Sequence, residues 1–561
     1  MALKKLPIGL SDFAELIEKN YYFVDKSMFI KELLDSGAKT TLFPRPRRFG
    51  KTLNLSMIRY FFEKTELSRR SLFNGLKIEQ HADCMFHQGK YPIIWLSFKD
   101  VKAKNWSFCY EKLCKTIGDE FKRHFEVLRP ILTELEMQDV QKIIAGTASQ
   151  SMYEHALLDL SKYLERGHHQ KVILLIDEYD AAIHEGFMSG YYDKIINFIR
   201  AFLGAGVKDN TALEFSVLTG ILRIARESLF SGLNNLEVWT FTSKYYSQQF
   251  GLLESEVLEI LSCFDLTNQI DSIRQWYDGY QSGPHKIYNP WSIINLVKNE
   301  GIEKPYWVNT SDNALVKTLL QQGTSGVKED LELIVQGKSI TKVINENMVM
   351  PDIYLDDNAL WNFLLMCGYL TFENYRPDPS LEGQFLAELK SPNIEVAYLY
   401  STQIQSWFGG SSDTLQIYQK MLQNLVAGNI DEFCELFSLF SVETISSFDT
   451  GGKKPEKFYH GFVLGMLASL RETHEIKSNR ESGWGRYDVM VIPKNKALPS
   501  IIIEFKTVSS LKKETLKIAA QNALKQIDDR QYETELHSRG ITNIIKMGIA
   551  FQGKKNLILV G

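Results

Sequence analysis

Short apolar runs alternate with longer amphipathic stretches through the first 245 residues of the chain. Five of the apolar runs have the length of strands: 40–43, 92–98, 172–177, 214–220 and 237–241. Helical periodicity fills the intervals between them, for example over 53–62 and 192–203. Strands that alternate with helices predict a parallel sheet covered on both faces, so we expect an α/β domain over residues 1–245.

The pattern changes twice after this domain, in agreement with a 561-residue chain that is too long for one hydrophobic core. Residues 246–450 have mostly helical periodicity, with loops rich in Gly, Pro and Asn. Residues 451–561 predict a compact αββαβ module: a helix at 457–470, strands at 486–492 and 500–505, a helix at 511–532 and a strand at 545–551, with a further strand at 556–560. Segments 410–412 and 451–455 are the linker candidates.

The composition excludes several classes of protein. Apolar residues make up 44% and charged residues 24%, which is typical of a well-packed soluble protein. Lys and Arg total 64 against 68 Asp and Glu, so the net charge of −4 indicates no general nucleic-acid affinity and any basic surface must be local. The six cysteines form no CxxC pair, which favours buried thiols in a reducing compartment. Without a secretory signal or a membrane-length apolar run, we expect a cytoplasmic protein with no membrane partner.

Residues 43–52 (FPRPRRFGKT) lie between an expected strand and an expected helix. A phosphate loop needs backbone N–H groups turned toward an anion, a Lys for the phosphate oxygens and a hydroxyl for Mg²⁺. Gly50, Lys51 and Thr52 supply the second half of the GxxxxGK[ST] pattern, while Arg45 stands where the first Gly belongs. The strand–loop–helix setting strengthens a tripeptide that is a weak signal by itself.

Residues 172–178 (VILLIDE) match the second signature of nucleotide hydrolases, an aliphatic strand followed by two carboxylates. Asp177 would reach Mg²⁺ together with Thr52, and Glu178 would polarise the attacking water. A core strand that ends in a solvated acidic loop is the alternative. Because the Gly-Lys-Thr tripeptide precedes this strand in the right order, the nucleotide interpretation is favoured.

The strand at 214–219 ends in Thr219, where related ATPases place a residue that senses the γ-phosphate. Arg223 and Arg226 follow on one helical face and can neutralise phosphate charge in cis or across a subunit interface, or can simply be solvated. Arg45, Arg47 and Arg48 can contact phosphates or nucleic acid, or can pair with the acidic turn that follows Asp177.

Six motifs together resemble one family. They are 45–53 (RPRRFGKTL), 176–180 (IDEYD), 230–235 (FSGLNN), 276–280 (WYDGY), 287–291 (IYNPW) and 306–310 (YWVNT). The sequence resembles the bacterial AAA-ATPase-like proteins that carry a C-terminal PD-(D/E)XK-type nuclease domain. The resemblance implies an ASCE-type P-loop core, in which the missing first Gly is usual. ATP would then be bound by Arg48, Phe49, Gly50, Lys51, Thr52, Leu53, Asp177, Thr219 and Arg223.

The aromatic residues of the middle motifs leave two interpretations open. Trp276, Tyr277, Trp291 and Trp307 can form a stacking surface for bases, or can be core residues of a helical lid, which we favour. Asn234 and Asn235 can reach the nucleotide or cap a turn.

Residues 486–506 predict a second site. Alternate residues of a strand share one face, so Glu504 and Lys506 point together, and Asp488 lies 16 residues back across a hairpin. Two carboxylates and a lysine at one sheet face form a hard-oxygen site for Mg²⁺ or Mn²⁺, with Lys506 orienting a water, whereas an ExK triplet alone is usually a salt-bridged surface. This pattern resembles the PD-(D/E)XK signature, with Tyr487 in place of the usual Pro.

Four further residues resemble helix positions of such nucleases or can lie near the site. Gln526 and Tyr532 resemble helix residues of RecB-like relatives, although their separation of six positions is not the usual spacing. Glu456 and His460 can contact metal and phosphate, although core or surface roles are equally expected.

The sequence therefore predicts an ATP-dependent or ATP-regulated, Mg²⁺- or Mn²⁺-dependent nuclease acting in defence, mobile-element control or repair. The expected catalytic residues are Glu178, Asp488, Glu504, Lys506 and Gln526, and the expected metal ligands are Thr52, Asp177, Asp488 and Glu504. Nucleic acid, DNA rather than RNA, is the expected partner, with a homo-oligomer as a further expectation. The alternatives are a nucleotide-operated switch or scaffold with a non-cleaving nuclease fold, and a P-loop domain that binds nucleotide without appreciable hydrolysis.

Overall fold

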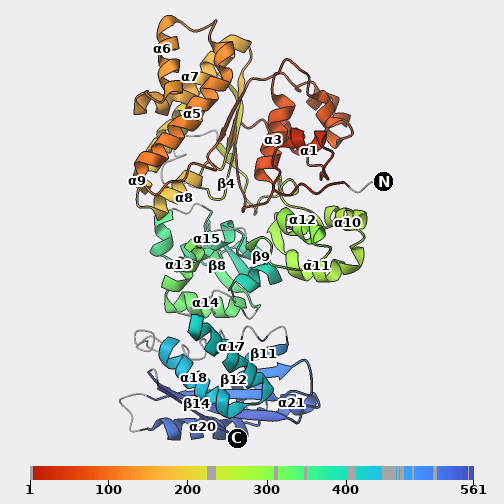
Figure 1. Cartoon of the computed structure of the whole chain (residues 1–561), viewed down its shortest axis with the longest axis vertical. Helices are drawn as coiled ribbons and strands as arrows, with labels where there is room; N and C mark the ends of the chain where they lie inside the picture. Colours follow the sequence, from red (N-terminus) through yellow and green to blue (C-terminus); the bar gives the residue numbers. More distant parts are fainter. Residues whose placement is uncertain are drawn as a thin grey trace. The chain divides into compact units, whose positions relative to one another are not determined.

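The structure, a computed structural model, is shown in Figure 1. It describes residues 4–223, 236–308, 314–335, 337–346, 350–400, 412–444, 473–482, 485–508, 514–553 and 555–561, together with Val463, Leu467 and Leu470. The chain divides into two compact units, Met1–Leu319 with Ser339–Val396, and Leu320–Lys338 with Ala397–Gly561. No helix among the described residues has the length and apolar character that crossing a lipid bilayer requires.

The first unit is built on a parallel five-stranded sheet. Its strands are β1 (Thr40–Pro44), β2 (Ile93–Ser97), β3 (Val172–Asp177), β4 (Leu213–Gly220) and β5 (Leu236–Val238), in the order β2-β3-β4-β1-β5. All neighbours are parallel, which confirms the predicted α/β architecture. The predicted strands are all present, although β5 is shorter than the predicted 237–241. Every residue of β1 and β3 is buried, as expected for a sheet covered on both faces.

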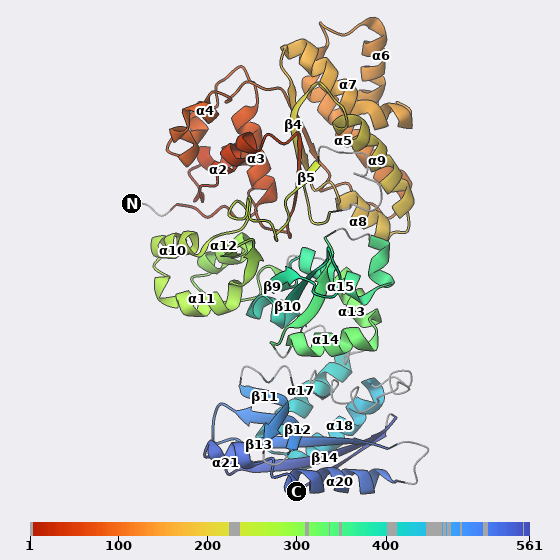
Figure 2. The same ribbon diagram turned by 180° about the vertical axis from the view of Figure 1, so that it is seen from behind.

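Helices cover the sheet on both sides. They are α1 (Phe13–Glu18), α2 (Met28–Ser36), α3 (Lys51–Phe62), α4 (Ala82–Met85), α5 (Trp106–Leu128), α6 (Glu134–Ala145), α7 (Gln150–His168), α8 (Ala181–Met188) and α9 (Tyr192–Val207). Figures 1 and 2 show α3 on one side of β4, and α5, α7 and α9 on the other.

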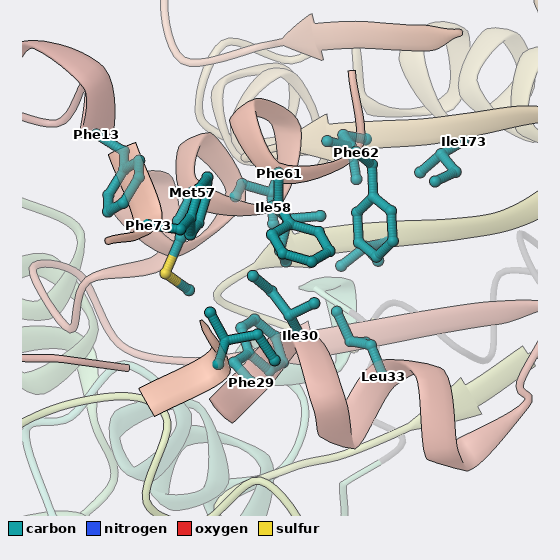
Figure 3. Close-up of a cluster of buried hydrophobic side chains, with 14 of the residues drawn as sticks. Phe13, Phe29, Ile30, Leu33, Met57, Ile58, Phe61, Phe62, Phe73 and Ile173 are labelled. Atoms are coloured by element: carbon teal, nitrogen blue, oxygen red, sulfur yellow. The ribbon is translucent and has the colours of Figure 1, made fainter. Parts of the chain in front are cut away.

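Packing under α3 sets the position of its first turn. Ile58, Phe61 and Phe62 on this helix are fully buried, in one core with residues that include Phe13 and Phe73. Figure 3 shows these side chains packed together between the helices and the strands. Because the core holds the helix against the sheet, the turn that begins at Lys51 lies just beyond the carboxyl end of β1.

The middle of the chain is mostly helical, as predicted. The helices are α10 (Glu254–Cys263), α11 (Ile270–Tyr277), α12 (Pro290–Lys298), α13 (Ala314–Gln322), α14 (Ser325–Val335) and α15 (Asp357–Met366). The sequence did not predict two small antiparallel sheets. One is the hairpin β6 (Tyr280–Ser282) and β7 (His285–Ile287), and the other is β8 (Ile340–Ile344), β10 (Phe385–Lys390) and β9 (Thr371–Pro377), in that order.

The second unit has a mixed five-stranded sheet in simple sequence order. Its strands are β11 (His474–Ser482), β12 (Gly485–Pro493), β13 (Ser500–Thr507), β14 (Ile544–Gln552) and β15 (Lys555–Val560). Only β13 and β14 are parallel, and α20 (Leu516–Asp529) connects them, followed by the short α21 (Thr534–Ser538). The predicted helix 511–532 is therefore shorter than expected, because Thr515 caps its first turn and the chain turns away after Asp529.

Two helices upstream of residue 451 belong to this second unit. α17 (Ser412–Ala427) and α18 (Ile430–Thr444) share a hydrophobic core with β12, β13 and β14. The compact unit therefore extends upstream of 451, where we expect the C-terminal domain to begin. The predicted helix 457–470 and the linker 451–455 lie mostly or wholly outside the described residues.

Candidate nucleotide and nuclease sites

The phosphate loop turns sharply into α3 through two residues with left-handed backbone. Arg48 has φ 68° and Gly50 has φ 85°. A side chain at position 50 would meet no atom within 4 Å, so the backbone conformation, rather than crowding, favours glycine there. The turn leaves the first N–H groups of α3 available, which is the arrangement that binds phosphate at a helix N-terminus.

Lys51 is folded back into this loop. Its Nζ donates hydrogen bonds to the carbonyl oxygens of Arg45, at 2.9 Å, and Pro46, at 2.8 Å. Burial lowers the pKa of Lys51, and the charges of Glu178 and Asp177 oppose that shift. A buried ammonium that faces two carboxylates across the loop can exchange its carbonyl partners for phosphate oxygens.

Asp177, the last residue of β3, is hydrogen-bonded both to Thr52 at the start of α3 and to Thr219 on β4. Its Oδ2 accepts a hydrogen bond from Thr52 Oγ1 at 2.8 Å, and its Oδ1 accepts one from Thr219 Oγ1 at 2.7 Å. Asp177 is completely buried. A hydroxyl and a carboxylate at the mouth of the loop are hard oxygen ligands, so these residues fit a Mg²⁺ ion that also binds phosphate.

Glu178 stands beside this group in an unusual backbone conformation. Its φ is 51°, a left-handed value that costs free energy in a residue other than glycine. Burial raises the pKa of Glu178, and the nearby Lys51 charge opposes the shift. The electrostatic effect of each of these charges on the other places the Glu178 carboxylate near Lys51.

The turn after Glu178 fixes the segment that leads to Arg223. Asp180 Oδ2 accepts hydrogen bonds from the backbone N–H groups of Ile221, at 2.8 Å, and Leu222, at 2.9 Å. Tyr179 Oη donates to the carbonyl oxygen of Leu222 at 2.6 Å. Both side chains lie inside the 176–180 motif, and these contacts were not expected from the sequence. Arg223 is half-buried, and its Nε has no hydrogen-bond acceptor within the described residues.

The second site lies where β12 and β13 meet α20. Asp488 Oδ2 accepts a hydrogen bond from the N–H of Phe505 at 2.8 Å, and Glu504 Oε2 accepts one from the N–H of Asp488 at 3.3 Å. Lys506 Nζ lies 3.6 Å from Glu504 Oε1, and Gln526 Nε2 donates to that same oxygen. The structure therefore brings together all four residues predicted for this site.

The electrostatics of the second site suit a cation. Glu504 is 2% exposed, and burial together with the charge of Asp488 raises its pKa to about 8, although Lys506 opposes the shift. Within the described part of the chain, no three His, Cys, Asp or Glu side chains cluster as a metal site. Two carboxylates still fit Mg²⁺, because this ion often keeps several waters and takes its remaining ligands from substrate phosphate.

Comparisons with known proteins identify a domain family at each end of the chain. A family model described as "Predicted AAA-ATPase" matches residues 7–230, and one described as "PD-(D/E)XK nuclease superfamily" matches residues 454–560. The N-terminal part of the chain is therefore an AAA-ATPase-like domain, and its C-terminal part is a domain of the PD-(D/E)XK nuclease superfamily. It is also 26% identical over 546 residues to a protein of Azotobacter chroococcum mcd 1 described as "Uncharacterized protein in vnfD 5'region", covering 96% of this chain and 95% of that one.

The two domain families define the general chemistry of the chain. AAA-ATPase-like and PD-(D/E)XK domains generally use a nucleotide and a divalent metal, and a nuclease domain indicates a nucleic-acid substrate.

Several predicted nucleotide contacts of the AAA-ATPase-like domain have side chains engaged elsewhere. The guanidinium of Arg48 lies over the ring of Trp291 at 4.4 Å, and the ring of Phe49 packs edge-on to Tyr280 at 5.1 Å. Leu53 packs against the core under α3. At these three positions the backbone, rather than the side chain, is what remains to contact a phosphate.

Arg45 is buried away from the surface where it could contact phosphates or nucleic acid. Its side chain is 1% exposed, donates to the carbonyl oxygen of Trp239 at 2.6 Å and lies over the ring of Phe250 at 5.0 Å. Burial lowers its pKa to about 9. Arg45 is therefore a buried residue whose side chain contacts Trp239 and Phe250. Arg226, Asn234 and Asn235 lie outside the described residues, as does the whole 230–235 motif.

Two of the four aromatic residues of the middle motifs are buried in the core, as we favoured, and the other two are half-buried. Tyr277 is fully buried and Trp307 is 1% exposed. Trp276 packs against the same core as Tyr277. Trp291 is half-buried beneath Arg48, so its face is already occupied by a guanidinium.

In the PD-(D/E)XK domain, Tyr532 lies closer to the site than its spacing suggested. Gln526 Nε2 donates to Tyr532 Oη at 3.1 Å, so the tyrosine holds the amide that contacts Glu504. The left-handed Gln531, at φ 52°, turns the chain back after α20 and makes this approach possible. Tyr487, in place of the usual Pro, is a fully buried core residue that donates to Glu535. Glu456 and His460 lie outside the described residues.

Proposed function

We propose that this protein hydrolyses ATP and cleaves nucleic acid in a Mg²⁺- or Mn²⁺-dependent reaction, and that its nucleotide state regulates cleavage. The observation that carries the proposal is the meeting of Asp488, Glu504, Lys506 and Gln526 at one end of the β12–β13 pair. These four residues come from three elements, β12, β13 and α20. A purely structural ion pair would need only two residues, Glu504 and Lys506.

At the nucleotide site, the N-terminus of α3 and Lys51 would bind the phosphates of ATP. Thr52 and Asp177 would hold the Mg²⁺ ion, and Thr219, whose hydroxyl donates a hydrogen bond to Asp177, would sense the γ-phosphate. Glu178 would orient and polarise the attacking water. Arg223 would offset phosphate charge in the same chain or across an interface between copies.

At the nuclease site, Asp488 and Glu504 would bind the divalent ion. When bound, the ion supplies an activated water and stabilises the charge that develops on the phosphate. Lys506, beside Glu504, would orient the water or offset that charge. Gln526 would fix the Glu504 carboxylate through its hydrogen bond.

We further propose DNA as the substrate, with foreign DNA, mobile elements or repair as the setting. This step rests on analogy with other enzymes that couple ATP hydrolysis to DNA cleavage.

The test is cleavage of linear, circular and single-stranded DNA and RNA, with Mg²⁺ or Mn²⁺, with and without ATP. Lys506→Ala should abolish cutting, whereas Lys517→Ala, which removes an exposed lysine of the same unit, should preserve it. Cutting that survives in Lys506→Ala would contradict the assignment of the site. If wild type hydrolyses ATP but cuts nothing, the nucleotide-operated switch becomes the better account.

A further inference from the structure

The phosphate loop is held from outside by residues of the middle region. Trp307 Nε1 donates a hydrogen bond to the carbonyl oxygen of Arg47 at 3.1 Å. The next residue, Arg48, lies over Trp291 at 4.4 Å. These two tryptophans come from separate motifs of the chain, and both contact the loop directly before Gly50 and Lys51.

The flanking loop residues are held in the same way. A side chain at Gly368 would lie 2.8 Å from Pro46 Cβ, so the backbone at 368 packs directly on the loop. The carbonyl oxygen of Phe49 accepts a hydrogen bond from Gly251 N at 3.2 Å. Each residue from 46 to 49 thus contacts a residue of the middle region.

Trp307 is itself held in place by Glu395. Glu395 Oε1 accepts a hydrogen bond from the backbone N–H of Trp307 at 2.5 Å. Its Oε2 accepts one from Ser292 Oγ at 2.7 Å. Glu395 is fully buried, so these hydrogen bonds are protected from water. The ring of Trp307 packs against Tyr369 at 5.2 Å between centroids. Both the backbone and the ring of Trp307 are therefore fixed before any nucleotide binds.

This loop needs external support for a reason that the sequence contains. The first Gly of GxxxxGK[ST] is replaced by Arg45, and the prolines at 44 and 46 have no N–H with which to close a turn. The left-handed backbone at Arg48 is costly for a residue with a side chain, and such a conformation persists only where surrounding contacts enforce it.

We propose that Trp307 and Glu395 are positioning residues of the nucleotide site, which hold the phosphate loop in its binding conformation before ATP arrives. This inference rests on the proposed function, because it assumes that ATP binds at this loop. The residues would act through the carbonyl of Arg47 and would not contact the nucleotide.

The first test is Trp307→Phe, which keeps an aromatic ring against Tyr369 and removes the N–H that reaches Arg47. The matched control is Trp361→Phe in α15, since Trp361 is fully buried and its Nε1 has no hydrogen-bond acceptor within the described residues. By titration calorimetry, Trp307→Phe should bind ATP about fivefold more weakly, the effect of one hydrogen bond. Trp361→Phe should bind as wild type does. Equal affinities in all three proteins would overturn the proposal.

A second pair of variants separates positioning from simple loss of stability. Glu395→Gln keeps an acceptor for the N–H of Trp307, whereas Glu395→Ala removes it. We expect Glu395→Ala to weaken ATP binding as Trp307→Phe does, and Glu395→Gln to restore most of the affinity. Loss of affinity in both Glu395 variants, or in neither, would contradict the role of this acceptor.

A third measurement needs no nucleotide. Hydrogen exchange of a peptide that covers residues 44–53 should be faster in nucleotide-free Trp307→Phe than in wild type or Trp361→Phe. If wild type bound no ATP, the proposed function would fail while the exchange experiment would still decide whether Trp307 holds the loop. Unchanged exchange in Trp307→Phe would show that it does not.

Discussion

Gln526 donates a hydrogen bond to Glu504 across the interface between α20 and β13, although 22 residues separate them. Glu504 is also in contact with Lys506 and with the backbone of Asp488. The orientation of this carboxylate is therefore set by three neighbours, one of them a neutral amide on a helix. A group that holds a metal ligand in place has consequences for activity that can be measured.

Gln526→Ala should reduce metal-dependent cleavage by about 10- to 100-fold, the usual effect of losing a residue that orients a metal ligand. The loss should shrink as Mg²⁺ or Mn²⁺ is raised, because the weakened step is metal binding. Gln521→Ala, an exposed glutamine on the same helix, is the control and should cleave as wild type does. A Gln526→Ala enzyme with full activity at low metal would show that Glu504 needs no such partner.

Lys51→Ala should abolish ATP binding without unfolding the protein. Its ammonium lies inside the loop on the carbonyl oxygens of Arg45 and Pro46, so its removal deletes the charge that phosphate requires while the apolar core under α3 is unchanged. Titration calorimetry measures the loss. ATP affinity equal to that of wild type would mean that the phosphate loop has been misassigned.

Glu178→Gln should bind ATP and fail to hydrolyse it, since an amide cannot polarise the attacking water. Phosphate release is the measurement, and we expect a fall of about 100-fold or more. Because the neutral amide also removes a buried charge, its thermal stability should not fall below that of wild type. Equal hydrolysis rates would instead favour another base.

The main elements of both domains were predictable from the sequence because their signals are local. The runs that form β1 to β4 are short, apolar and bounded by helical periodicity, and their predicted bounds lie within a residue or two of the observed ones. β11 (HEIKSNRES) was missed because it is mostly polar, and its place in the sheet depends on pairing with β12.

The site contacts that were missed are those that no local pattern encodes. Trp307 and Glu395 are 88 residues apart, and nothing in the 306–310 motif indicates Glu395 as a partner. Tyr532 reaches Gln526 only because Gln531 adopts a left-handed backbone, which spacing rules for a continuous helix do not anticipate. Residue types and strand order could be predicted, whereas contacts made by tertiary packing could not.

Gly220→Ala should destabilise the nucleotide domain by about 1–3 kcal/mol through overpacking. The added Cβ would lie 2.6 Å from Tyr179 Cε1 and 2.8 Å from Asp180 Oδ1, the two side chains that hold the segment before Arg223. Gly204→Ala in α9 is the control, because a Cβ there meets no atom within 4 Å and should stabilise the helix by roughly 0.5–1 kcal/mol. Urea unfolding compares the two, and a Gly220→Ala protein as stable as Gly204→Ala would refute the close packing described.

Glu395 should make stability depend on pH near neutrality. Burial raises its pKa from 4.5 to about 7, and its hydrogen-bond donors, the Ser292 hydroxyl and the backbone N–H groups of Trp307 and Val308, are neutral. Below about pH 4.5 both folded and unfolded states hold the proton. Between about 4.5 and 7 the folded state keeps it while the unfolded state releases it, so the free energy of unfolding falls as pH rises.

The pH effect can be isolated with Glu395→Gln, which cannot titrate. As the pH rises from about 4.5 through 7, the free energy of unfolding of the wild type should fall by about 3 kcal/mol relative to that of the variant. It should fall no further above about pH 8. The tyrosines that face Glu395, Tyr277 and Tyr306, have pKa values raised above the ordinary 10.0 by burial, so they do not titrate in this range. Urea unfolding of both proteins at pH 5 and pH 8 gives the difference. A constant difference between them would mean that Glu395 is already ionised at pH 5, and that its hydrogen bonds outweigh its burial.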